Sequence, residues 1–123
     1  MLYSIMIYAE DGAYERLPED IQERIMEGHL ALQTALADRG DYATVKLMPP
    51  SSAVTINSIE ELGQTPLVVD GPFADTKETF LGIYIAEFKD LEEALKFAKY
   101  LASPYARIEI RPAVWAGGIL STE

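Results

Sequence analysis

Apolar residues along this chain occur in two spacings: short runs, and longer segments with an apolar residue at every third or fourth position. The short runs are rich in β-branched and aromatic residues and predict strands at residues 2–8, 42–47, 80–88 and 107–111. Two further β-type runs, residues 53–56 and 66–69, flank residues 57–65 and predict a hairpin or side arm.

The longer segments predict two amphipathic helices. The first begins at about Pro18 and ends at Gly40, with two acidic residues in its first turn beside the positive end of the helix dipole. At about 100° per residue, its inner face contains Ile21, Ile25, Gly28, His29, Leu32 and Leu36. The second helix follows the N-cap Asp90 and runs to about Leu101, with Leu91, Leu95 and Ala98 expected to face inward.

The resulting order is strand, helix, strand, an inserted hairpin, then strand, helix, strand. This order predicts an α+β protein of the ferredoxin-like, split βαβ type, with an antiparallel sheet and both helices on one face. No repeat or linker divides the chain, so residues 1–123 are expected to form a single domain. If Tyr3, Tyr84 and Ile108 line the other sheet face, that face is too apolar for water, and a second copy would cover it in a homodimer.

The amino-acid composition argues against several classes of binding partner and site. The 123 residues include 20 acidic and 10 basic side chains, and the net charge of -10 predicts that the protein binds neither nucleic acid nor anionic membrane surfaces. The absence of cysteine excludes disulfides and thiolate metal sites. The N-terminus does not resemble a signal peptide, and no apolar run approaches the roughly 20 residues that span a bilayer. We therefore expect a cytoplasmic protein.

The stretch Asp70–Glu78 reads Asp-Gly-Pro-Phe-Ala-Asp-Thr-Lys-Glu and lies between two predicted strands. Its first three residues have a structural interpretation, in which Asp70 accepts backbone N–H bonds, Gly71 provides an extended or positive-φ backbone, and the proline fixes the next φ. That interpretation does not explain Phe73 or Lys77. In one interpretation Phe73 packs against the end of the sheet and Lys77 is a solvent-exposed loop residue. In the other, the two side chains form one wall of a cleft, where Lys77 is the cation for an anionic group.

These nine residues match the longer signature of a branch of the YCII-related superfamily that is named for its Asp-Gly-Pro-Phe motif. The chain resembles that branch also in a first strand that ends at Tyr8, in the segments Leu81–Tyr84 and Asp90–Ala94, and in Glu109–Pro112 of the last strand. The resemblance implies ferredoxin-like subunits that assemble as dimeric α+β barrels. The chemistry of such proteins is mostly unassigned.

His29 is the single histidine of the sequence, and its context is similar to the His-Leu-Ala of YCII proteins. Its reference pKa of about 6.5 suits a general acid or base, whereas the alternative is a core histidine with satisfied hydrogen bonds. Asp38 lies on the opposite face of the helix and cannot be its partner. In the superfamily the proposed partner carboxylate lies near an Asp-Pro-aromatic motif, where this chain has Ser103-Pro104-Tyr105.

The remaining carboxylates that can pair with His29 are Asp70 and Asp75, and either would raise the histidine pKa. The first functional hypothesis is therefore an enzyme with a His/Asp pair for acid–base chemistry, of the isomerase or lyase type, on an unidentified small hydrophobic molecule. Candidate ligand-binding residues are Phe73, Lys77, Tyr8 and Tyr84. The second hypothesis is a non-catalytic ligand-binding or regulatory subunit. No metal site or cofactor is expected, because the sequence has neither the residue spacing of a metal-binding motif nor a phosphate-binding glycine loop.

Overall fold

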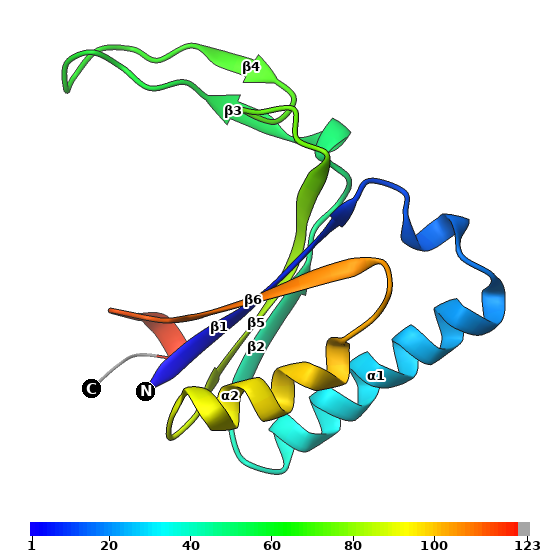
Figure 1. The fold of residues 1–123 in the computed structure, drawn as a ribbon. Helices are drawn as coiled ribbons and strands as arrows, with labels where there is room; N and C mark the ends of the chain where they lie inside the picture. The colour runs from blue at the N-terminus through cyan, green and yellow to red at the C-terminus, as the bar shows by residue number, and fades with distance from the viewer. Residues whose placement is uncertain (121–123) are drawn as a thin grey trace.

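The sheet of this protein follows the predicted ferredoxin-like arrangement. The computed structural model describes residues 1–120, and its four main strands lie in the antiparallel order β2-β5-β1-β6. These strands are β1 (Leu2–Glu10), β2 (Tyr42–Lys46), β5 (Glu78–Glu87) and β6 (Ala106–Pro112). The helices α1 (Glu19–Ala37) and α2 (Leu91–Ala98) cover one face of this sheet (Figure 1). The α+β class and the split βαβ order are confirmed.

Individual residues explain where helix α2 begins and which of its side chains are buried. The carboxylate of Asp90 accepts a hydrogen bond from the Glu93 backbone N–H at 2.9 Å, which confirms the predicted N-cap of α2. The predicted inner face of α2 is partly wrong, because Leu91 and Leu95 are exposed. Small residues let this short helix lie close to the sheet, and its buried side chains are Ala94 and Ala98. No helix within residues 1–120 has the length and apolar character to span a membrane.

The core lies between the sheet and the helices. Its largest fully buried side chains are Ile5, Leu32, Leu36, Tyr84 and Phe88. The prediction that Tyr3, Tyr84 and Ile108 line the second sheet face is wrong, since the first two are core residues and Ile108 packs against the core.

Strand alternation explains the correction. Odd-numbered residues of β1 point toward the helices, so even-numbered ones point away from them. The open face, which no helix covers, therefore presents Met6 and Tyr8 from β1 and Ile83 and Ile85 from β5, all half-buried.

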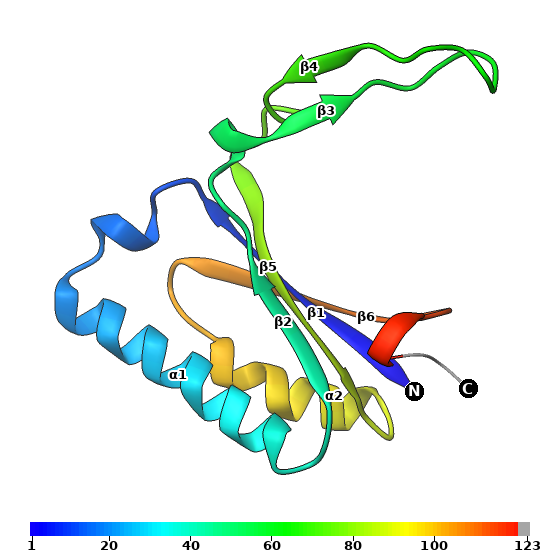
Figure 2. The ribbon, with the colours of Figure 1, turned by 180° about the vertical axis from the view of Figure 1, so that it is seen from behind.

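The inserted segment forms an arm, which we define as residues 53–77. Within it, β3 (Val54–Ile56) pairs only with β4 (Val68–Asp70), and this two-stranded hairpin extends beyond the end of the main sheet, on the side away from the helices (Figures 1 and 2). Gly71 follows β4 with a φ of 96°, so the predicted positive φ is confirmed. The carboxylate of Asp70 makes no hydrogen bond within the described residues, so its predicted capping of the turn is wrong.

Candidate functional site

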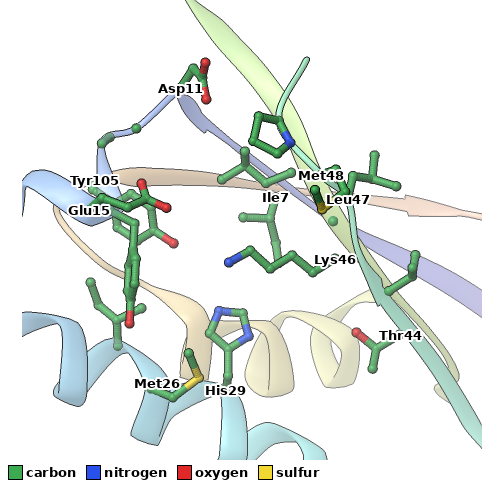
Figure 3. Close-up of a pocket in the computed structure, with 18 of the residues that line it drawn as sticks. Ile7, Asp11, Glu15, Met26, His29, Thr44, Lys46, Leu47, Met48 and Tyr105 are labelled. Carbon is green, nitrogen blue, oxygen red and sulfur yellow. The ribbon is translucent and has the colours of Figure 1, made fainter. Parts of the chain in front are cut away.

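A cavity of about 540 Å³ opens between α1, β2, β5 and the turn that follows β1 (Figure 3). This volume is within the usual range for small-molecule sites, roughly 300–1,000 Å³. Most of its lining is apolar or aromatic, and includes Ile25, Met26, Leu47, Met48, Leu81 and Tyr105. The polar side chains that reach it are few, which is typical of a pocket that orients one small ligand.

His29 projects from α1 into this cavity (Figure 3). Its Nδ1 lies 2.9 Å from the hydroxyl of Tyr84, and Gln33 Nε2 donates to the same hydroxyl at 3.0 Å. A phenol oxygen has one proton and two lone pairs, so a Tyr84 that accepts from Gln33 can either donate its proton to His29 Nδ1 or accept a second hydrogen bond from Nδ1–H. In the first arrangement the neutral imidazole carries its proton on Nε2, and in the second it carries it on Nδ1. Tyr84 is only 2% exposed, and the core therefore fixes the ring through this bond.

The surroundings of His29 favour its neutral form. Burial of the ring lowers the pKa of His29 below its ordinary value of 6.5, and the positive charge of Lys46 lowers this pKa further. An acidic partner would have shifted the pKa of His29 in the opposite direction. At pH 7 the side chain is therefore mainly uncharged.

Lys46 is the last residue of β2, and its side chain runs across the cavity near His29 (Figure 3). Its Nζ lies 5.7 Å from the centre of the Tyr14 ring, within the range of a cation–π contact. Opposite Lys46 in β5 is Gly82, where a Cβ would lie 2.7 Å from the carbonyl oxygen of Val45. This glycine lets β2 and β5 approach closely and keeps the space beneath Lys46 open.

Three exposed carboxylates, Glu10, Asp11 and Glu15, line the solvent side of the cavity. Glu10 is 3.9 Å from Arg16 Nη2 and 4.0 Å from Lys77 Nζ, and such exposed pairs contribute little to stability. Within residues 1–120, no three His, Asp or Glu side chains converge where they could hold a metal ion.

The structure brings together only some of the candidate residues. His29 and Tyr84 meet in the cavity, and Lys77 reaches its rim through Glu10. The other arm candidates, Asp70, Asp75 and Phe73, do not line the cavity, and Phe73 is 90% exposed.

Tyr8 is on the open face of the sheet instead. Its hydroxyl donates to Glu109 Oε1 at 3.3 Å, and its ring centre lies 5.6 Å from that of Phe80. Strand alternation in β1 places Tyr8 on this face. The partner strand β5 has a bulge here, because Leu81 is an extra residue between the pairs Ile7–Gly82 and Tyr8–Phe80. The bulge leaves Leu81 and Gly82 on the cavity side and Phe80 beside Tyr8.

Sequence reasoning missed Gln33 and Lys46, although both had a signal. Gln33 is four residues after His29 and therefore lies on the same face of α1, one turn further on. Lys46 shares the helix-facing side of β2 with Tyr42, because side chains in a strand alternate between faces. A search for polar residues at these spacings from His29 and Tyr42 would have found them.

Comparisons with known proteins agree with this fold. Residues 1–114 match the family model of the YCII-related domain. The chain is also similar to an uncharacterised protein of Rhizobium meliloti (strain 1021), with 35% identity over 116 residues that cover 91% of each protein. The chain therefore belongs to the YCII-related family.

Proposed function

We propose that this protein binds a small, largely apolar molecule in the His29 cavity and carries out acid–base chemistry of the isomerase or lyase type on it. The observation that carries the proposal is the 2.9 Å contact of His29 Nδ1 with the buried hydroxyl of Tyr84, because it fixes a titratable ring in a cavity of about 540 Å³. Fixed polar groups in an apolar cavity are the usual components of a small-molecule site.

His29 is the proton-transferring residue in this proposal. In this proposal Tyr84 donates to Nδ1, so Nε2–H faces the ligand and serves as a general acid toward a ligand oxygen, a role that a neutral imidazole fills in other enzymes. The proton that leaves the ligand carbon passes to water at the solvent side of the cavity, and water returns a proton to the ring. Tyr84 and Gln33 orient the ring, which is the task that sequence reasoning gave to Asp70 or Asp75. Neither arm carboxylate is needed for this role.

A second candidate function is ligand binding without chemistry. The carboxylates of the cavity favour it, because Glu10, Asp11 and Glu15 are exposed on its solvent side, and none forms an ion pair or hydrogen bond with His29 within residues 1–120. Such a site has the His29 side chain as a donor, but no carboxylate close to it that could act as the second proton-transfer group.

Native mass spectrometry of the purified protein tests the binding step, since it detects a small molecule retained from the expression host. In D₂O, wild-type protein should then catalyse hydrogen–deuterium exchange at a carbon of that molecule, His29→Gln should lose the exchange, and Asp70→Asn should keep it. Binding without exchange would favour the second candidate. Exchange that survives in His29→Gln would contradict the role of His29.

We also propose that the protein is a homodimer in which two open sheet faces pack together, as in a dimeric α+β barrel. The open face presents half-buried Met6, Tyr8, Ile83 and Ile85, and the arm exposes Val54, Ile56, Leu62, Leu67, Val68 and Phe73. An isolated two-stranded hairpin is marginally stable in water, so this arm needs a partner.

Light scattering after size-exclusion chromatography should give twice the chain mass of 13.6 kDa. Ile83→Glu, on the open face, should yield a folded monomer, whereas Lys96→Glu, on exposed helix α2, should remain dimeric. A wild-type monomer at micromolar concentration would contradict the dimer.

A further inference from the structure

The chemical group that faces His29 can be inferred from the donors around it. The unbonded edge of the imidazole, where Nε2 carries the proton in the proposed tautomer, and the Lys46 side chain lie on neighbouring walls of one cavity (Figure 3). Neither donor has an acceptor there, since no carboxylate forms an ion pair with Lys46 and no oxygen bonds Nε2 within residues 1–120. Two adjacent donors without an acceptor form a site for an oxygen that carries negative charge.

We propose that Lys46 and His29 bind the oxyanion end of the ligand, so that its class is a small amphipathic carboxylate, or an oxo compound that forms an enolate. This inference rests on the proposed function, because it specifies the ligand of the same cavity. Charge stabilisation by a preorganised cation and a neutral donor is a large term in enolate chemistry.

The charge around the cavity is more balanced than that of the whole chain, because three cations lie near the three carboxylates Glu10, Asp11 and Glu15. The protein carries 10 basic and 20 acidic residues, yet Lys46, Lys77 and Arg16 all gather at this cavity or its rim. Lys77 and Arg16 pair with Glu10, which reduces the repulsion that this carboxylate exerts on an incoming anion. Lys46, an exposed residue on the cavity wall, remains the cation available to a ligand, and its Nζ contacts the Tyr14 ring.

The apolar body of the ligand has a defined place. Tyr14 and Tyr105 form an aromatic wall, with ring centres 5.9 Å apart, and Met26 and Leu47 contribute further apolar surface. Met side chains adapt to irregular shapes, and aromatic rings contribute large contact areas. The ligand therefore lies with its oxygen at Lys46 and its hydrocarbon part toward this wall.

A matched pair of probes tests the inference without knowledge of the natural ligand. We would titrate the protein with 4-phenylbutyrate and with 4-phenylbutanol, which differ in the charged group, and follow binding by calorimetry and by NMR of the single imidazole. The acid should bind at least tenfold more tightly, equivalent to about 1.4 kcal/mol. It should also raise the His29 pKa, because an anion beside the ring stabilises the imidazolium.

Lys46→Met keeps the length of the side chain and should remove the preference for the acid. Lys96→Met makes the same change of net charge on α2, outside the cavity, and should leave the preference intact. Equal binding of acid and alcohol, a preference that survives in Lys46→Met, or no binding of either probe would overturn the inference. Deuterium exchange by wild-type and His29→Gln protein tests the proposed function separately, so the two can fail independently.

Discussion

The cavity and the arm differ in how their residues are held. His29 in the cavity is fixed by a hydrogen bond to Tyr84, which is 2% exposed, whereas Phe73 on the arm is 90% exposed. The arm carries eight of the nine residues of the signature that is most easily recognised in the sequence, yet none of the nine lines the cavity. The recognisable signature therefore marks the arm and its turn, whereas the side chains that are held in place for chemistry lie in the His29 cavity.

This difference has an energetic basis. A site must hold its groups in place before the ligand arrives, which requires packing against a core. The arm has backbone pairing between two short strands and little buried surface, so it gains most from a second copy of the chain. The comparison predicts that substitutions near His29 alter the fold and the site together, while those on the arm alter assembly.

The largest effect is expected at Gly28, beside His29 in α1. A Cβ there would lie 2.5 Å from the backbone carbonyl oxygen of Tyr100, so Gly28→Ala should destabilise the protein by about 1–3 kcal/mol. Helix propensity alone predicts the opposite, a gain of about 1 kcal/mol. Chemical denaturation measures the change, with exposed Glu27→Ala as a control that should stay within about 0.5 kcal/mol. A stabilised Gly28→Ala would show that this helix contact is not tight.

A smaller effect is expected at Gly71 on the arm. Its φ of 96° is unfavourable for a residue with a Cβ, so Gly71→Ala should cost about 1 kcal/mol. Asp70→Ala should leave the free energy of unfolding nearly unchanged, because its carboxylate makes no hydrogen bond within the described residues. Thermal melts of both variants check this, and a large loss in Asp70→Ala would restore the capping role of Asp70.

The pH dependence of stability should reveal His29. Because the pKa of His29 is lowered in the folded state, the unfolded chain binds a proton more readily at this residue. Its contribution to stability is complete above the ordinary pKa of 6.5 and is lost as the pH falls below that value. The difference in unfolding free energy between wild type and His29→Gln should therefore shrink from pH 7 to pH 5. A difference that grows as the pH falls would contradict the lowered pKa.

The smallest effect on the subunit itself is expected at Phe73. Phe73→Ser should change the unfolding free energy of the monomeric Ile83→Glu background by about 0.5 kcal/mol or less, since the ring is 90% exposed. The same substitution in the dimer should weaken association, which analytical ultracentrifugation measures. A large loss of monomer stability would place Phe73 in the fold of the subunit.

The sequence predicted the order of strands and helices along the chain because apolar spacing and caps such as Asp90 are local signals. It placed Tyr3 and Tyr84 on the wrong sheet face, because both faces of β1 and β5 carry apolar residues and the pattern does not identify the covered one. His29 was identified as a candidate because it lies on the predicted inner face of the first helix. Alternation from Tyr42 could have placed Lys46 on the helix-facing side of β2, but its approach to His29 depends on the long-range pairing of β2 with β5.

The most direct test of the account is the pKa of the single imidazole, measured by NMR in wild type and four variants. We expect a wild-type pKa below 6.5 that rises in Lys46→Met, changes in Tyr84→Phe, and is unaffected by Asp70→Asn or Asp75→Asn. Wild-type titration above 6.5, with a fall in either arm variant, would contradict it. That result would show that an arm carboxylate is the partner of His29, and that the arm belongs to the site.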